Sequence, residues 1–188
     1  MSDAITKEIT KKGASNDEFS VPEACFIPDV EVFLKKYGQD QAMGTLKELL
    51  SKFNFMSENL TFQKRNLLRK IPDIQQSLES VQFIKRKSAE GDSYVTQFPL
   101  TDNVHAKAEL KPTSTVFLWL GANVMLEYSV DEAEALLVDS QQSAQTSLAN
   151  IDKSLAFLRE QITTTEVNIA RSHNYTVRAR QRAAAVEA

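Results

Sequence analysis

Apolar residues recur at alternating spacings of four and three over one long stretch of this chain. Nine of twelve successive positions are apolar, the exceptions being Ser57, Lys64 and Lys85. The positions are 46, 50, 53, 57, 60, 64, 67, 71, 74, 78, 81 and 85. A seven-residue repeat kept over five heptads is typical of a coiled-coil helix, whose apolar stripe needs a partner. We therefore predict a first long helix over residues 39–88, kinked and not ended by Pro72, because the repeat keeps its phase across the proline.

A second repeat of the same kind occupies the C-terminal third of the chain. Eight of its twelve positions are apolar, and these positions are 137, 141, 144, 148, 151, 155, 158, 162, 165, 169, 172 and 176. Ser129 and Glu132 stand three residues apart, in the form of a capping box. The acidic first turn and the arginines from Arg178 to Arg182 complement the helix dipole. The sequence predicts a second long helix over residues 129–183.

Between the two repeats the apolar period changes to two. Val104 to Leu110 alternate apolar and polar side chains, and residues 95–100 can pair with them across a turn at 101–103. Val116 to Tyr128 form two apolar runs around Gly121 and Asn123, which tolerate positive φ. We predict two β-hairpins over residues 94–128. The fold class is then mainly α, a long antiparallel two-helix coiled coil with two β-hairpins between the helices.

The second hairpin is too apolar to stand in water by itself. Its runs imply that both faces are buried, and the chain offers little other material to cover them. We therefore predict that it joins other subunits. The predicted assembly residues are Phe117, Trp119, Leu120, Val124, Met125 and Leu126.

The remaining segments are short. Residues 1–20 are polar and unpatterned, which predicts a disordered N-terminal tail. Residues 21–38 form a short, largely apolar approach segment with turns at Pro22 and Pro28. Residues 184–188 are expected to form a C-terminal tail.

Antiparallel pairing brings the start of the first helix beside the end of the second, where the second repeat turns polar. An apolar stripe facing Thr165, Ser172 and Thr176 would stay partly exposed to solvent and could bind non-native client chains there. The predicted client-binding tip residues are Leu46, Leu49, Leu50, Phe53, Phe55, Met56, Tyr175 and Val177. In the alternative, a local rotation of the second helix covers the stripe with four of its side chains, Val167, Ile169, Tyr175 and Val177.

Composition argues against several classes of function. The formal net charge of −3 and pI near 5.5 are unlike those of a nucleic-acid binder, and no apolar run suits a membrane span. A lone Cys25 indicates a reducing, cytosolic or nuclear location. His105 and His173 are isolated and no phosphate-binding loop is present, so we expect no catalytic residues, no cofactor and no metal site. Basic runs such as Lys85 to Lys87 are interpreted as solvated helix faces.

Several motifs resemble a known family. The stretch from Trp119 to Tyr128 (WLGANVMLEY) is the most specific, and the others are KFNFM at 52–56, IPDI at 71–74, FLRE at 157–160 and TTTEVN at 163–168. Over roughly residues 21–180 the chain resembles the subunit 3 family of eukaryotic prefoldin. The resemblance implies an α-type subunit whose strands join the β-barrel body of a heterohexamer with other prefoldin subunits.

The resemblance further implies ATP-independent capture of nascent actin and tubulin and their delivery to the cytosolic chaperonin. A cytoplasmic location follows, with a nuclear pool left open, and neither nucleic acid nor membrane is an expected partner. The alternative hypothesis is a coiled-coil scaffold that tethers folded partners without chaperone activity. Only the first should suppress the aggregation of unfolded protein.

Overall fold

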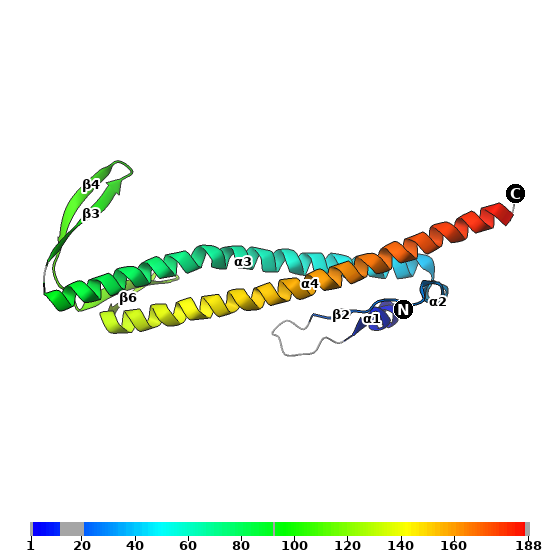
Figure 1. The fold of residues 1–188 in the computed structure, drawn as a ribbon, viewed down its shortest axis with the longest axis horizontal. Coiled ribbons are helices and arrows are strands. Elements are labelled where there is room, and N and C mark those ends of the chain that lie inside the picture. The colour runs from blue at the N-terminus through cyan, green and yellow to red at the C-terminus, as the bar shows by residue number, and fades with distance from the viewer. Residues whose placement is uncertain (1, 12–20, 92, 187–188) are drawn as a thin grey trace. The chain divides into compact units, whose positions relative to one another are not determined.

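The computed structural model describes residues 2–11, 21–91 and 93–186. The chain forms two compact units, unit 1 from residues 1–63 and 151–188 and unit 2 from residues 64–150. Each unit contains a part of both long helices, which Figure 1 labels α3 and α4. The two units are described separately below.

The two long helices dominate the chain. Helix α3 spans Gln39–Glu90, against an expected 39–88, and α4 spans Val130–Val186, against an expected 129–183. The helix continues through residues 184–186 of the expected C-terminal tail, and residues 187 and 188 lie outside the described residues. Every predicted seam position except Lys85 is buried or half-buried. The predicted fold class is confirmed, and α3 continues through Pro72 as expected.

The two helices run antiparallel in unit 2, because the end of α3 meets the start of α4. Lys85 Nζ lies 2.7 Å from both Asp131 Oδ1 and Glu134 Oε2. Gln82 Nε2 donates a hydrogen bond of 3.1 Å to Glu134 Oε1. Beneath these contacts a small core forms around Val81, Val130 and Ala133.

The start of α4 is fixed by the predicted capping box. Glu132 N donates to Ser129 Oγ at 3.3 Å, and Ser129 N donates to Glu132 Oε2 at 3.2 Å. Two amides that the first helical turn leaves unpaired thus gain partners reciprocally. The structure confirms the capping-box interpretation.

Unit 2 also contains the two predicted hairpins. Strands β3 (Tyr94–Thr101) and β4 (Val104–Leu110) pair antiparallel, as do β5 (Thr115–Gly121) and β6 (Val124–Ser129). Each pair is a separate two-stranded sheet. The β5–β6 turn holds Ala122 at φ 48° and Asn123 at φ 62°, the two positive values that a type I′ hairpin loop requires. A barrel body would need strands from further chains.

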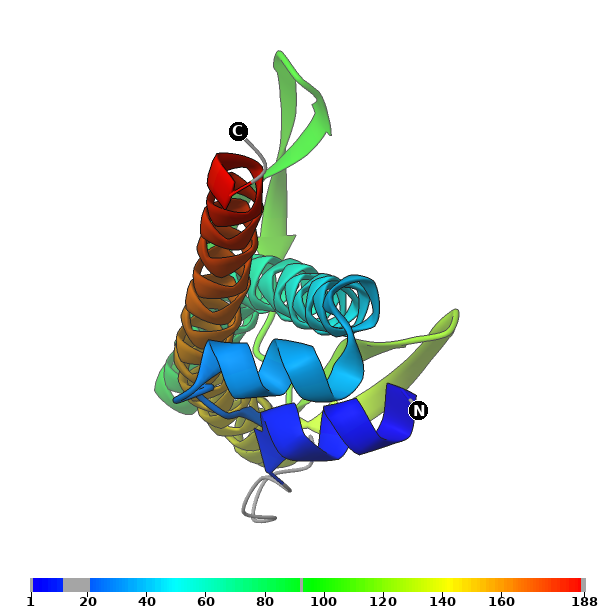
Figure 2. The same ribbon diagram turned by 90° about the vertical axis from the view of Figure 1, so that its right-hand side faces the viewer.

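Unit 1 adds an N-terminal layer to the ends of the long helices. It contains α1 (Ser2–Ile9), β1 (Thr10–Lys11), β2 (Glu23–Ala24) and α2 (Val30–Tyr37). Asp29 caps α2 by accepting hydrogen bonds from the amides of Glu31 and Val32 at 3.0 and 3.2 Å. Figure 2 shows α1 and α2 side by side, joined where Lys36 and Tyr37 both contact Glu8.

The prediction of a disordered tail is wrong for residues 2–11, and residues 12–20 lie outside the described residues. Ile5 and Ile9 of α1 are buried in the core of unit 1. They are spaced four residues apart, so both lie on one face of a two-turn helix. The polar residues between them concealed this pattern in the sequence. The two isoleucines pack in a core that includes α2, and the Glu8 contacts together with a hydrogen bond from Cys25 N to the Ile9 carbonyl attach the segment further.

Candidate functional site

The second hairpin exposes large apolar side chains to solvent. Phe117 and Trp119 of β5 are 65% and 60% exposed. Leu120, Val124, Met125 and Leu126 are exposed as well, so all six predicted assembly residues lie on the surface of the isolated chain. Removing such side chains from water is worth roughly 1.5–3 kcal/mol each, which a partner surface can supply.

Register decides which of these side chains share a face. Trp119 lies opposite Met125, and Phe117 lies opposite Glu127 two positions along the same strand. Directly opposed residues point to the same side of a two-stranded sheet. Phe117, Trp119 and Met125 therefore form one apolar patch, which we call the outer face of the β5–β6 hairpin.

The opposite face holds the hairpin on its own chain. Val116, Leu118 and Tyr128 pack against the core around Val81, Val130 and Ala133. A groove of about 690 Å³ runs between this hairpin and the two helices, lined by side chains within residues 70–77, 117–120 and 136–140. Phe117 and Trp119 also line this groove. The hairpin is thus anchored through Val116, Leu118 and Tyr128, while most of the surface of Phe117 and Trp119 stays exposed and can meet another subunit.

The first hairpin carries a comparable apolar surface, which the sequence analysis did not include among its assembly residues. Its exposed large apolar side chains are Val95, Phe98, Leu100, Val104 and Leu110. The period-two alternation was the available signal, but it was interpreted as one buried face. The half-buried residues of this hairpin are Tyr94 and Thr96 of β3 and the small residues Ala106 and Ala108 of β4.

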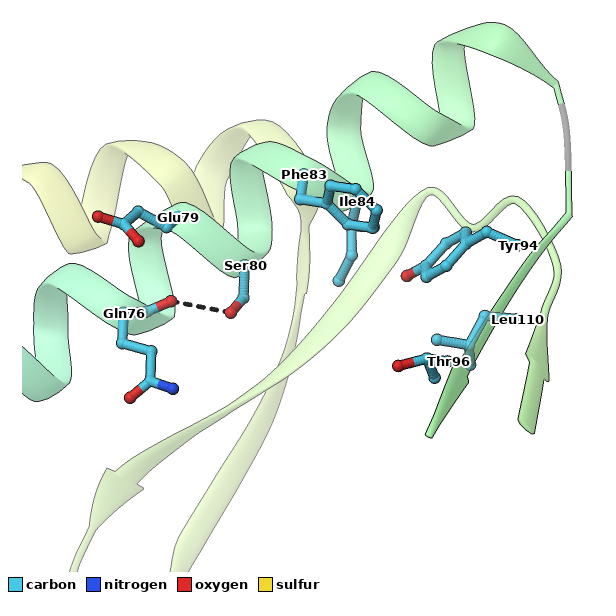
Figure 3. Close-up of a pocket in the computed structure, with 8 residues that line it drawn as sticks. All are labelled: Gln76, Glu79, Ser80, Phe83, Ile84, Tyr94, Thr96 and Leu110. Atoms are coloured by element: carbon cyan, nitrogen blue, oxygen red, sulfur yellow. Dashed lines mark hydrogen bonds between the residues drawn. The ribbon is translucent and has the colours of Figure 1, made fainter. Parts of the chain in front are cut away.

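A shallow groove joins this hairpin to α3. Figure 3 shows the lining residues, with Phe83 and Ile84 of α3 facing Tyr94, Thr96 and Leu110 of the strands. The rings of Phe83 and Tyr94 meet edge to face, with centroids 5.1 Å apart. The groove has a volume of about 360 Å³. The base of the hairpin is therefore held by an aromatic pair, while the rest of its apolar surface extends beyond it.

The predicted client-binding tip is mostly covered. Leu46, Leu49 and Phe53 are buried, with Phe53 only 1% exposed. The expectation that this stripe stays exposed to solvent is therefore wrong for these three residues. Leu50, Met56 and Tyr175 are half-buried, whereas Phe55 and Val177 are exposed. The cover comes from the N-terminal residues as well as from Ile169 and Tyr175 of α4. Val167 and Val177 remain exposed, so the alternative covering also holds only in part.

Three polar residues of α4 that the sequence analysis missed bind the N-terminal segment. Gln161 Oε1 accepts a 2.7 Å hydrogen bond from Ala24 N. Asn168 accepts from Ile27 N at 3.1 Å and donates to the Cys25 carbonyl at 2.8 Å. Arg171 donates to the carbonyls of Ile27 and Pro28 and stacks over the Phe26 ring at 4.4 Å. Residues 161, 168 and 171 follow the helical period, but nothing marked their partners.

Charge organises the junction between α3 and α4 in unit 2. The hydrogen bond from Lys85, followed by that from Gln82, holds the pKa of the Glu134 carboxyl below its ordinary value. Hydrogen bonds to Asp131 and Glu134 raise the pKa of Lys85 in turn. Over residues 2–11, 21–91 and 93–186, no group of three His, Cys, Asp or Glu side chains is placed to hold a metal ion. None of the helices in those ranges combines the length and hydropathy that crossing a bilayer requires.

Comparison with known proteins identifies the family. The profile described as "Prefoldin subunit" matches residues 53–175, a region that includes both hairpins and most of both seams. The chain belongs to the prefoldin family. The match begins after α2, so the N-terminal layer of unit 1 lies outside the matched prefoldin region.

Individual prefoldin subunits resemble the chain over most of its length. It is 45% identical to prefoldin subunit 3 of Mus musculus over 165 residues, which cover 86% of this chain and 84% of that protein. It is 44% identical to the probable prefoldin subunit 3 of Schizosaccharomyces pombe over 160 residues, covering 83% and 94%.

The fold also matches a solved prefoldin. A chain from the cryo-EM structure of the filamentous prefoldin of Methanocaldococcus jannaschii aligns with a TM-score of 0.50 at 18% identity. The alignment covers 62% of this chain and 94% of that one. The likeness supports the prefoldin fold of paired long helices and hairpins.

Proposed function

We propose that this chain is one subunit of a hetero-oligomeric prefoldin cochaperone that captures non-native polypeptides without ATP. The observation that carries the proposal is the outer face of the β5–β6 hairpin, where Phe117 and Trp119 are largely exposed in the isolated chain. Contiguous exposed apolar surface on a soluble protein marks an interaction site. Because the chain resembles prefoldin subunit 3 proteins, we propose other prefoldin subunits as the partners of this surface.

Open strand edges support assembly independently of side-chain burial. Each hairpin is a two-stranded sheet, so both of its outer edges present unpaired backbone groups. Two-stranded hairpins are marginal in water, and three or more strands with a covered apolar face are needed for stability. Pairing with hairpins of neighbouring subunits would satisfy both requirements and build the expected β-barrel body of a heterohexamer.

Client capture is proposed for the α3 and α4 segments of unit 1. Phe55 is 69% exposed and Val177 is also exposed, while Leu46, Leu49 and Phe53 lie one layer beneath the N-terminal residues. Apolar contacts of this kind are sequence-tolerant, which suits clients that share only exposed hydrophobic surface. We propose nascent actin and tubulin as clients and the cytosolic chaperonin as the acceptor, with a cytoplasmic location.

Nothing in the proposed cycle requires a catalytic residue. Capture and release follow from the balance between apolar burial and the conformational entropy of the client. The subunit therefore holds a chain reversibly and passes it on by mass action.

Reconstitution tests the proposal. Co-expression with the other prefoldin subunits of the same organism, followed by native mass spectrometry, should give a heterohexamer that contains this chain. The purified complex should suppress light scattering by denatured actin diluted from guanidinium, with no nucleotide present. A complex that assembles but leaves aggregation unchanged would favour the scaffold hypothesis, and a stable lone monomer would contradict both.

A further inference from the structure

The hydrogen bonds between α4 and the N-terminal segment are made to main-chain atoms. Gln161, Asn168 and Arg171 together bind Ala24 N, Cys25 O, Ile27 N, Ile27 O and Pro28 O. Every one of these partners is a backbone amide or carbonyl. Any polypeptide offers the same groups, so these hydrogen bonds do not depend on side-chain identity, and the side-chain contact of this row is the Arg171 guanidinium over the Phe26 ring.

Burial makes these polar groups depend on an occupant. Asn168 is 1% exposed, and Gln161 is buried as well. A buried amide side chain without a hydrogen-bond partner is strongly unfavourable, and an extended strand satisfies both its donor and its acceptor. If the N-terminal segment leaves, water or another strand has to replace it.

An apolar surface lies beside this polar row. Leu46, Leu49 and Phe53 of α3 share one core with side chains of the N-terminal layer. The covering side chains are Ile5, Ile9, Val21, Ile27, Val30, Phe33 and Leu34. A row of backbone-binding side chains next to an apolar surface is suited to an extended, apolar peptide segment.

The N-terminal layer is attached in a way that allows it to leave as a unit. Gly38, at φ 81°, separates α2 from α3 and can absorb a change in chain direction. Strands β1 and β2 share only two residue pairs, and the ion pair between Lys36 and Glu8 is solvent-exposed. The stronger attachments are the buried apolar side chains and the hydrogen bonds to α4, and a competing segment that displaces the layer has to replace both.

The seam face of α4 carries buried polar residues in unit 1. Thr165, Ser172 and Thr176 are buried along α4, and Ser172 Oγ has no hydrogen-bond partner in the part of the chain that the structure describes. A seam of this kind gains less from burial than an apolar one. Exposing this face of α4 in unit 1 to water therefore requires less free energy than exposing a fully apolar seam.

We propose that residues 2–11 and 21–37 are a cis-acting occupant of a peptide-binding face, and that an extended apolar segment of a non-native chain displaces them to bind Asn168, Gln161, Arg171 and the α3 stripe. The identity of the competing segment, a non-native client chain, rests on the proposed function. The N-terminal residues then act as a strap: closed, they cover Leu46, Leu49 and Phe53, and open, they expose a site that fits a client segment.

One variant, Asn168→Cys, can be studied with its strap either released or locked by a linker. Cys25 is the single cysteine of the chain, and its carbonyl lies 2.8 Å from Asn168 Nδ2. The variant Asn168→Cys therefore has two thiols, within reach of a short bis-thiosulfonate linker that dithiothreitol cleaves. Without the linker the variant lacks the two Asn168 hydrogen bonds, so its strap opens more easily than in the wild type, and we call this the released state. With the linker closed, the strap is tied to α4.

The readout is local to this subunit. A benzophenone amino acid replaces the exposed Phe55 in the reconstituted complex, and reduced, carboxymethylated α-lactalbumin serves as a soluble unfolded probe. We expect photo-crosslinking to this subunit to fall about tenfold when the linker closes, because a locked strap removes the binding-competent state. Dithiothreitol should restore it. The Cys25→Ser, Asn168→Cys double variant, which has one thiol, should show no change with the linker.

Two results would overturn the strap proposal. Equal crosslinking in the locked and released states would show that the probe binds without displacing the strap, whether or not the complex suppresses aggregation. A second measurement needs no client: native-state hydrogen exchange of the wild-type complex should show the amides of Ala24 and Ile27 opening before those of α3 residues 46–60. Opening of both segments in one step would make the N-terminal layer a fixed part of the core. Failure to suppress aggregation alone would instead count against the proposed function.

Discussion

Lys85 of α3 and Glu134 of α4 meet with Nζ and Oε2 2.7 Å apart, at the point where the two long helices pair in unit 2. The same ammonium group contacts Asp131 Oδ1, and Gln82 also binds the Glu134 carboxyl. Lys85 stands at a seam position where the heptad repeat calls for an apolar residue. Its charge instead neutralises the acidic first turn of α4, where carboxylates favour the helix dipole but repel one another.

The first prediction concerns pH. The folded-state pKa of Glu134 is lowered from 4.5. A lowered pKa means that stability gained from the ionised carboxyl is complete above pH 4.5 and is lost as pH falls through the folded-state pKa. We expect Glu134→Gln to lower the melting temperature at pH 7, and the difference from the wild type to shrink as pH falls below 4.5 through the lowered folded-state pKa. Glu166→Gln, at an exposed site on the same helix, is the matched control; a gap that widens in acid would contradict the assignment.

The second prediction concerns assembly. Trp119→Ala should leave the helicity of the chain unchanged but weaken its incorporation into the prefoldin complex, because the ring is exposed on the outer hairpin face. Truncating an aromatic at the centre of an interface costs about 2–4 kcal/mol of association free energy. Subunit-exchange kinetics followed by native mass spectrometry measure the effect. Phe62→Ala removes an equally exposed aromatic from α3 and should assemble normally.

A third prediction tests the capping box at the start of α4. Ser129→Ala removes the acceptor of the Glu132 amide and should cost about 0.5–2 kcal/mol in urea denaturation. Faster hydrogen exchange at residues 131–133 would locate the loss. Ser143→Ala makes the same change at an exposed position inside the helix, where alanine is slightly favourable. Equal effects of the two substitutions would argue against a capping role.

The fourth prediction concerns the proline inside α3. Pro72 cannot donate to the Leu68 carbonyl, and an interior proline costs about 3 kcal/mol relative to alanine. We expect Pro72→Ala to stabilise unit 2 by up to about that amount, measured by thermal unfolding of the assembled complex. Arg69→Ala, at an exposed site one turn earlier, should have little effect. A destabilising result would mean that the packing around residue 72 requires a bent helix.

Much of the architecture could be predicted because it depends on local periodicity. The phase of each heptad repeat correctly indicated the buried face of α3 and of α4, including the change of period at residue 94. Ser129 and Glu132 identified the start of α4, and Gly121 with Asn123 identified the tip of the second hairpin. Each signal involves residues within a few positions of one another, where backbone geometry leaves few alternatives.

The tip of unit 1 could not be predicted in the same way. Leu46 and Phe53 are apolar in either case, and their exposure depends on whether a distant segment folds over them. That segment is held by hydrogen bonds such as the one between Cys25 and Asn168, 143 positions apart. A buried Asn168 that binds backbone atoms and a solvated Asn on a polar helix face look the same in the sequence.

The sequence by itself determined two long helices, two hairpins and the apolar faces that make this chain an assembling prefoldin subunit, because side-chain period is set by backbone geometry. Tertiary structure alone decided what covers each apolar face. The N-terminal residues cover the α3 stripe of unit 1, while the outer face of the β5–β6 hairpin stays uncovered within the chain. The physical reason is that burial depends on which surfaces meet in space, and local periodicity carries no information about a partner 140 residues away or on another subunit.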